Sequence, residues 1–209
     1  MDIDAFILVG GKSRRFGRDK ATFPFEGTTL AERTAATIRN AFPSAGITLV
    51  AADEAQFSAS LGLVQRFPFI FDIHKGRGPL GAIHAALAHS RAAWAFIIAC
   101  DFPYVSSELL LRLAGLISSE TDAIVPVQPD QRVQPLCCLW GVGECLNTVA
   151  EILELNKATP PVKAVFEHVR MRLVPFAELA DLPGADRFFI NINNQSDYIS
   201  SQRLVFDLQ

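Results

Sequence analysis

Short apolar runs alternate with amphipathic stretches along most of the chain. Consecutive apolar residues that end at a glycine or a turn are typical of strands buried in a parallel sheet, whereas apolar residues three and four positions apart predict helices. We expect Thr28 or Thr29, and Ser106 or Ser107, to cap two of the helices. Strands are expected over residues 4–11, 46–52, 68–73, 95–101, 122–128, 135–140 and 187–192, and helices over 29–42, 78–90, 106–118, 145–156 and 161–169. This order predicts one α/β domain over residues 1–209, a Rossmann-like, mostly parallel sheet with helices on both faces.

Composition and charge narrow the class of protein. Half of the 209 residues are hydrophobic and the formal net charge is -3. An acidic chain is a poor general binder of nucleic acid, and no apolar run approaches the roughly 20 residues of a membrane span. We therefore expect a cytoplasmic protein that binds neither nucleic acid nor membranes. The four cysteines show no CxxC or His/Cys spacing, which favours reduced, mostly buried thiols over a zinc site: Cys100, Cys137, Cys138 and Cys145.

The loop after the first expected strand departs from this charge balance. The stretch "LVGGKSRRFGRDKATF", residues 8–23, contains three glycines and five basic residues, opposed only by Asp19. Ligands of open α/β sheets bind at the carboxyl ends of the strands, where glycines let backbone N–H groups approach phosphate oxygens. The spacing fits neither the P-loop nor the GxGxxG fingerprint. From the residues alone, an anion site and a solvated basic turn both stay open.

The same stretch closely resembles the signature L-x-G-G-x-S-x-R-x-G-x-D-K of the MobA-like nucleotidyltransferases, the molybdenum cofactor guanylyltransferases. The resemblance implies a fold of the nucleotide-diphospho-sugar transferase type and a loop that wraps the nucleotide phosphates. It implies that Lys20 contacts these phosphates. Carried over to this chain, it assigns nucleotide binding to Leu8, Val9, Gly10, Gly11 and Lys20, and catalytic roles to Arg15 and Lys20.

Asp101 follows an apolar run in "IIACDFPYV". A lone aspartate after a strand is commonly a turn residue, but a carboxylate beside a phosphate-binding loop also suits Mg²⁺. The segment resembles the C-D-x-P motif of the family, whose aspartate binds Mg²⁺. The resemblance thus makes Asp101 a metal ligand that also contributes to catalysis and nucleotide binding.

Two further segments resemble the family's nucleotide and acceptor sites. "FDIHKGRGPLGAIHAAL" implies nucleotide-binding roles for Asp72, Gly78, Pro79 and Leu80, although Gly81 stands one position before the second glycine of the pattern. Lys75 and Arg77 in this segment suit a substrate contact or a solvated surface equally well. "FFININNQSDY" and "DQRVQPLCCLW" imply acceptor-binding roles for Asn191, Asn193 and Gln134. On a strand, Asn191 and Asn193 would face the same way.

The chain also departs from the family pattern. The asparagine that often ends the family's second strand and contacts the nucleotide has no counterpart, since Ala51 or Ala52 stands at that position. One nucleotide contact is therefore lost or supplied from elsewhere. The turn after Asn193 reads "NQSDY" in place of the family's "TPEDL".

The resemblance implies an Mg²⁺-dependent transfer of GMP from GTP to the terminal phosphate of molybdopterin, with release of pyrophosphate. GTP and molybdopterin are then the substrates, and proteins that donate or accept the cofactor are possible transient partners. Gly10, where cytidylyl relatives carry alanine, leaves space beside the base. Alternatives are a cytidylyltransferase or another sugar- or polyol-phosphate nucleotidyltransferase, and a non-catalytic nucleotide-binding chaperone of the cofactor.

Overall fold

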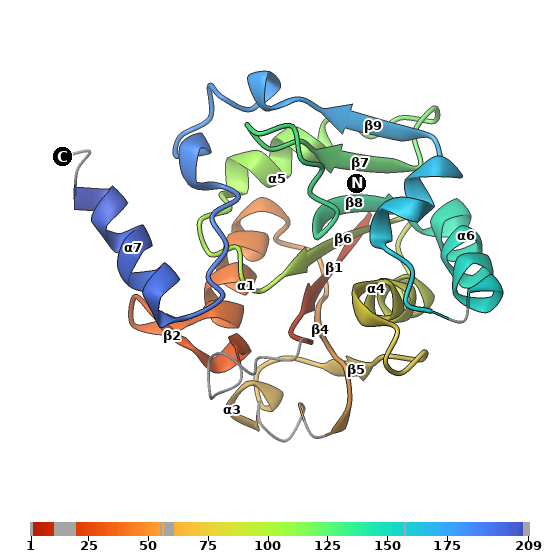
Figure 1. The fold of residues 1–209 in the computed structure, drawn as a ribbon, viewed down its shortest axis with the longest axis horizontal. Helices are drawn as coiled ribbons and strands as arrows, with labels where there is room; N and C mark the ends of the chain where they lie inside the picture. Colours follow the sequence, from red (N-terminus) through yellow and green to blue (C-terminus); the bar gives the residue numbers. More distant parts are fainter. Residues whose placement is uncertain (1, 11–19, 55, 57–60, 157, 207–209) are drawn as a thin grey trace.

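A seven-stranded sheet forms the centre of the protein, which we analysed as a computed structural model (Figure 1). The structure describes residues 2–10, 20–54, 56, 61–156 and 158–206. The strands lie in the order β5-β4-β1-β6-β8-β7-β9, and β8 runs antiparallel to both of its neighbours while the other pairs are parallel. Their bounds are Ile3–Leu8 for β1, Ile47–Ala51 for β4, Phe69–Phe71 for β5, Trp94–Ala99 for β6, Ala123–Pro126 for β7, Cys137–Gly141 for β8 and Met171–Val174 for β9. The single, mostly parallel α/β domain predicted from the sequence is confirmed.

Helices cover both faces of this sheet. Helices α1 (Leu30–Ala41) and α5 (Ser107–Ala114) pack together on one face, and α4 (Gly78–His89) and α6 (Val142–Leu155) pack together on the other (Figure 1). Alternation along β1 separates the two cores, since Ile7 packs with the first helix pair and Phe6 with the second. Burial of both faces explains why the strands read as continuous apolar runs.

Smaller elements complete the chain. A two-stranded hairpin joins β2 (Pro24–Phe25) to β3 (Thr28–Thr29) just after the short helix η1 (Lys20–Thr22). The C-terminal helix α7 (Gln195–Phe206) lies beside this hairpin at the edge of the molecule (Figure 1). The remaining short helices are α3 (Leu61–Val64), η2 (Val162–Glu167), η3 (Phe176–Glu178) and η4 (Ala185–Arg187).

Side-chain caps fix the starts of two helices as expected. Thr29 caps α1, because its hydroxyl accepts from the Glu32 backbone N–H while the Glu32 carboxylate accepts from the Thr29 N–H. This reciprocal pair is a capping box. Ser106 caps α5 in the simpler way, its hydroxyl accepting from the Leu109 N–H at 3.2 Å.

Two expected elements differ from the structure. The strand expected over residues 187–192 is wrong: the segment forms η4 and irregular chain, and its apolar side chains Phe188 and Ile192 are buried in two different clusters. An apolar run this short does not by itself distinguish a strand from packed irregular chain. Residues 161–169 contain the 3₁₀ helix η2 in place of a longer α-helix, and Pro160 and Pro161 precede its start.

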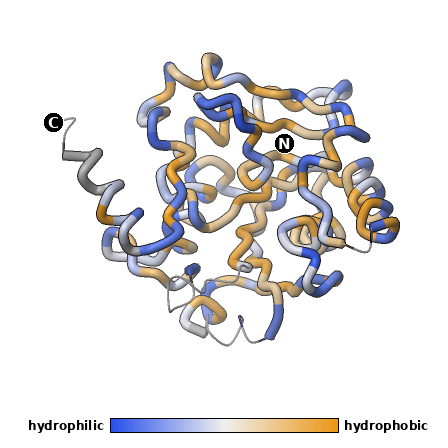
Figure 2. The backbone as a smooth tube through the Cα atoms, viewed as in Figure 1, coloured by the Kyte–Doolittle hydropathy of each residue, from blue (hydrophilic) through white to orange (hydrophobic). Residues whose placement is uncertain are grey.

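Hydropathy follows the layers, with hydrophobic residues along the central strands and hydrophilic ones in the peripheral turns (Figure 2). Among the described residues, no helix has the length and apolarity that a membrane crossing requires. The four cysteines are buried, as predicted, and no disulfide joins them within the described residues. Burial raises the pKa of the Cys137 thiol to about 12, which makes this sulfur unreactive at neutral pH.

Candidate active site

The carboxyl ends of β5, β4, β1 and β6 meet at one edge of the sheet because these strands are parallel neighbours. Backbone hydrogen bonds continue just beyond the strands and keep the ends together. The Cys100 N–H donates to the Leu8 carbonyl at 3.2 Å, and the Asp72 N–H donates to the Ala51 carbonyl at 3.0 Å. Asp101 and Asp72, far apart in the sequence, therefore lie along the same edge.

Lys20 is the centre of a polar cluster at this edge. Its Nζ donates to Asp101 Oδ2 at 2.5 Å, to Asn193 Oδ1 at 2.8 Å and to Asn191 Oδ1 at 3.4 Å. The side chains of Lys20 and Asp101 are each 15% exposed, so the ammonium is reachable from solvent and shielded on most sides. We call Lys20, Asp101, Asn191 and Asn193 the Lys20 cluster. Asp101, which the sequence analysis assigned to the metal, and Asn191 and Asn193, which it assigned to the acceptor, thus surround the ammonium group of Lys20, which it assigned to phosphate.

Backbone contacts place the two asparagines in this cluster. The Ile192 N–H donates to the Asp101 carbonyl at 3.0 Å, which ties residues 191–193 directly to the end of β6. The Asn193 N–H donates to Asp197 Oδ2 at 2.7 Å, and the Asp197 N–H donates to Asn194 Oδ1 at the start of α7. The two carboxamides therefore point the same way without the strand that the sequence suggested.

An aromatic cluster links the chain segments that make these contacts. The ring of Phe25 lies edge-on to the rings of Tyr104 and Tyr198, at centroid distances of 5.5 and 5.6 Å. Tyr104 Oη donates to Ser201 Oγ at 2.8 Å. The cluster joins the hairpin that follows Lys20, the turn that follows Asp101 and helix α7, and so holds the three segments of the Lys20 cluster in place.

The Lys20 cluster fits a divalent cation by its donor set. Asp101 Oδ1 is buried and finds no hydrogen-bond partner among the described residues, so one carboxylate oxygen is left for another ligand. Asn191 and Asn193 add carbonyl-type oxygens on the same side. One carboxylate, neutral oxygens and substrate phosphates form a set that suits Mg²⁺. The described part of the chain contains no group of three His, Cys, Asp or Glu side chains placed to bind a metal.

Asp72 forms a second, separate feature of the edge, beyond β5. Its side chain is buried, 7% exposed, and Oδ1 lacks a hydrogen-bond partner within the described residues. Burial, and secondarily the charge of Asp53, raises the pKa of this carboxyl to about 7. Near neutral pH Asp72 can therefore offer a ligand either an acceptor oxygen or an O–H donor.

The turn into α4 owes its residues largely to packing. Gly78 has a φ of +62°, and a Cβ placed there would lie 3.0 Å from the Thr159 methyl. A Cβ on Gly81 would lie 2.9 Å from the His74 carbonyl, so this glycine is required by close approach. Pro79 is exposed and Leu80 is fully buried, which leaves only the Leu80 backbone for a ligand. Arg77 donates from Nη2 to the Leu153 carbonyl at 2.7 Å and thus anchors the turn to the end of α6.

Other predicted residues lie at or near the same edge. Leu8 and Val9 are buried, so they can offer a ligand only backbone groups, and Gly10 follows them in the open. Gln134 is buried before β8, and its Oε1 accepts from the Leu136 N–H at 3.4 Å. Gly11 and Arg15 lie outside the described residues, so their expected roles stay predictions. The rings of His74 and His84 pack edge to face, with their centroids 4.7 Å apart.

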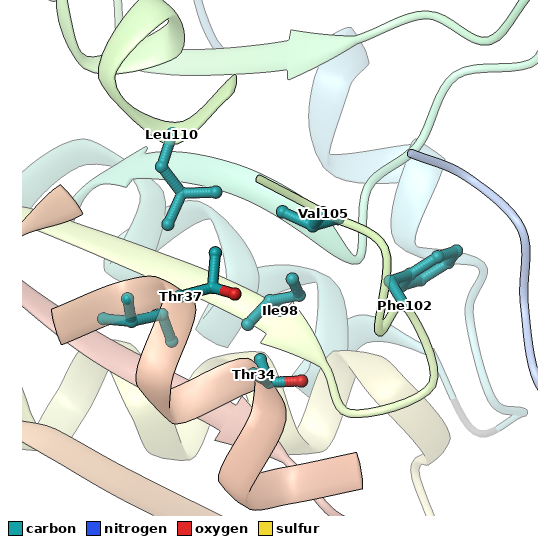
Figure 3. Close-up of a pocket in the computed structure, with 7 residues that line it drawn as sticks. Thr34, Thr37, Ile98, Phe102, Val105 and Leu110 are labelled. Atoms are coloured by element: carbon teal, nitrogen blue, oxygen red, sulfur yellow. The ribbon is translucent and has the colours of Figure 1, made fainter. Parts of the chain in front are cut away.

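A narrow gap in the core is distinct from this edge. It lies between α1, α5 and β6 and is lined by apolar and threonine side chains, including Thr34, Ile98 and Val105 (Figure 3). The Thr34 hydroxyl donates to the Leu30 carbonyl within its own helix and turns no free donor toward the gap. The gap is a packing feature between two layers and not a ligand site.

Gln56 is the residue of this edge that sequence reasoning missed. Its side chain bonds the ends of two strands, accepting from the Ala52 N–H at 3.0 Å and donating to the Val9 carbonyl. The sequence carries no specific signal for this role, because a polar residue a few positions after a strand is common in loops of every kind.

Comparison with known proteins finds similar chains over nearly the whole length of the protein. The MobA-like NTP transferase domain matches residues 5–171. A relative from Methanosarcina acetivorans, named probable molybdenum cofactor guanylyltransferase, is 31% identical over 92% of this chain and 87% of its own. The crystal structure of molybdopterin-guanine dinucleotide biosynthesis protein A from Archaeoglobus fulgidus has a TM-score of 0.79 at 24% identity, covering 98% of this chain and 99% of that one.

The fold extends to enzymes with other substrates. The structure of 2-C-methyl-D-erythritol 4-phosphate cytidylyltransferase from Thermus thermophilus has a TM-score of 0.64 at 16% identity, covering 98% of this chain and 99% of that chain. This likeness concerns the fold alone. Since the family match spans most of the chain, the protein belongs to the MobA-like NTP transferases, a family of nucleotidyltransferase enzymes.

Proposed function

We propose that the protein transfers GMP from GTP to the terminal phosphate of molybdopterin, with or without bound molybdenum, and releases pyrophosphate. The observation that carries the proposal is the Lys20 cluster, in which a cationic side chain, a carboxylate and two carboxamides converge at the strand ends. The guanylyltransferase name of the Methanosarcina acetivorans relative supports the choice of nucleotide and acceptor. In this proposed function the protein works in the cytoplasm and meets donors and acceptors of the cofactor transiently.

The reaction joins two phosphates. An oxygen of the acceptor's terminal phosphate forms a bond to the α-phosphorus of GTP, and the bond from this phosphorus to the bridging oxygen of pyrophosphate breaks. An acceptor phosphate that is already ionised needs no strong general base. Such a transfer depends on positioning and on charge neutralisation.

The residues of the Lys20 cluster divide this task. Lys20 would leave its present partners to neutralise charge on the departing pyrophosphate, assisted by Arg15 and by the backbone around Gly10 and Gly11. Asn191 and Asn193 would orient the acceptor phosphate, with Gln134 nearby on the same edge. Asp101, with its unpartnered Oδ1, would hold Mg²⁺. Bound there, Mg²⁺ supplies Lewis-acid polarisation of phosphate oxygens.

The backbone groups of Leu8, Val9 and Gly10 and the turn at Gly78, Pro79 and Leu80 would flank the nucleotide. Asp72 would contact it from the end of β5, as an acceptor or, when protonated, as a donor. These roles rest on the resemblance of the motifs and on the convergence of their segments at one edge.

Equilibrium binding of GTP, CTP, ATP and UTP, each with and without Mg²⁺, tests the choice of nucleotide. We expect selective GTP binding that Mg²⁺ strengthens, and a loss of this Mg²⁺ effect in Asp101→Ala. Preference for CTP would move the protein to cytidylyl transfer, the activity named for the Thermus thermophilus neighbour. Absence of binding to all four nucleotides would contradict nucleotidyl transfer by this chain.

A further inference from the structure

The β1 and β4 strands separate at their carboxyl ends, and one side chain fills the opening. The last regular contact between them is the Val9 N–H to the Val50 carbonyl at 3.0 Å. In a parallel ladder the next bond would run from the Ala52 N–H to the Val9 carbonyl. The Gln56 carboxamide occupies that place, with Oε1 accepting from the Ala52 N–H and Nε2 donating to the Val9 carbonyl. We call this opening the β1/β4 fork.

The fork presents an adjacent donor and acceptor of the main chain toward the ligand edge. A primary carboxamide matches such a pair because it carries a carbonyl oxygen beside an N–H. The Watson–Crick edge of guanine has the same arrangement, with O6 as acceptor beside the N1–H donor. Gln56 therefore satisfies, within the protein, a pair of backbone groups that a guanine base could satisfy from outside.

The surroundings of the fork agree with a site for a base. A Cβ on Gly10 would lie 3.5 Å from the Ala52 nitrogen and 3.6 Å from Gln56 Oε1, so the lack of a side chain at position 10 leaves the fork accessible. Asp72 lies at the next strand end, bonded through its N–H to the carbonyl of Ala51. Gln56 also stands near the place where the chain lacks the family's nucleotide-contacting asparagine.

Resting on the proposed function, we infer that Gln56 is a placeholder for the nucleobase. In the free protein its carboxamide bonds to the Val9 carbonyl and the Ala52 N–H, and the base of the bound nucleotide replaces it on both groups. Gln56 thereby competes with every base, so that a base must supply both a donor and an acceptor to displace it.

The Gln56 side-chain amide signals in a ¹H–¹⁵N spectrum report the displacement directly, and their absence from Gln56→Ala identifies them. We expect saturating GTP to move these signals to the position of a solvent-exposed glutamine. Signals that stay unchanged while GTP is bound would overturn the inference and leave the proposed function standing.

Affinity provides the second readout. We expect Gln56→Ala to bind GTP about five- to tenfold more tightly than the wild type. The base then no longer competes with the carboxamide, and the net free energy of about one hydrogen bond corresponds to this factor. Gln65→Ala, which removes an exposed glutamine from the same part of the chain, is the matched control and should not change affinity. Equal or weaker GTP binding by Gln56→Ala, with an unchanged melting temperature, would contradict a placeholder role.

The same titration with CTP separates the placeholder role of Gln56 from the proposed guanylyl transfer. Cytosine carries an N3 acceptor beside an N4–H donor, so it can also displace the carboxamide. Displacement by CTP in a protein that does not bind GTP would refute guanylyl transfer and uphold the placeholder. A protein that binds GTP without displacement would do the reverse, and one that binds neither nucleotide would overturn both.

Discussion

Asp72 imposes a pH-dependent cost on folding that one substitution should remove. The carboxyl is 7% exposed, and its burial, together with the nearby charge of Asp53, raises its pKa from 3.8 to about 7. The folded protein therefore binds this proton more tightly than the unfolded chain does. The contribution of Asp72 to the free energy of unfolding is therefore most favourable below about pH 4. It decreases as the pH rises through about pH 7, because the folded protein must then ionise a buried carboxyl.

The magnitude follows from the two pKa values. A shift of one pKa unit corresponds to about 1.4 kcal/mol, so full ionisation costs the fold about 4 kcal/mol as an upper limit. Linkage gives a cost of about 2 kcal/mol near pH 5, which approaches the full value of about 4 kcal/mol near pH 8. Asp72→Asn keeps the shape of the side chain and removes the ionisation. The stability of the variant relative to the wild type should thus increase by about 2–3 kcal/mol between these two pH values.

Urea denaturation of both proteins across this pH range measures the difference. All other titrating groups are common to the two proteins, so their contributions largely cancel. Asp2→Asn, which neutralises an exposed carboxylate, controls for the change in net charge. Asp53→Asn should reduce the slope, since it removes the like charge that contributes to the raised pKa. A stability difference that does not vary with pH would refute the assignment of a buried, ionisable Asp72.

Three further predictions test the site and the fold. Lys20→Ala or Asp101→Ala should lower turnover about 10²- to 10³-fold with an unchanged melting temperature, and near-wild-type turnover of Asp101→Ala would refute its metal role. Gly78→Ala should destabilise the fold by about 1–3 kcal/mol in urea denaturation, because φ is +62° and the Thr159 methyl lies 3.0 Å from the new Cβ, whereas an unchanged midpoint would show that the turn relaxes without strain. Thr29→Ala should cost about 1 kcal/mol by loss of the capping box, and Thr29→Ser, which keeps the hydroxyl, should restore most of it.

The sequence predicted the elements that local physics determines. The β1 and β6 strands are buried on both faces, so their residues are apolar apart from Asp4 near the start of β1, and Gly10 and Asp101 follow their ends. The start of α1 was predictable because a threonine followed three residues later by a glutamate forms a capping box. The convergence of Lys20 and Asp101 was foreseen through parallel topology, which brings strand ends to one edge.

The remaining features depend on contacts between distant segments. The β9 strand forms by pairing with β7, which lies far earlier in the chain. Met171 of β9 pairs with Ala123 of β7, 48 positions away. Asn191 and Asn193 were expected on a strand, but their direction is fixed by the bond from Ile192 to the Asp101 carbonyl and by the start of α7. Gln56 bonds to Val9, 47 positions away, and nothing in its neighbours indicates this contact.

The transfer reaction itself tests the central claim most directly. Purified protein would be incubated with molybdopterin, Mg²⁺ and either GTP or CTP, with pyrophosphate release followed and the pterin product identified by mass spectrometry. We predict pyrophosphate release and a GMP adduct of molybdopterin with GTP, neither of them with CTP, and release slower by about 10²- to 10³-fold with Asp101→Ala. GTP that binds yet yields no pyrophosphate and no adduct would contradict a catalytic role for the Lys20 cluster.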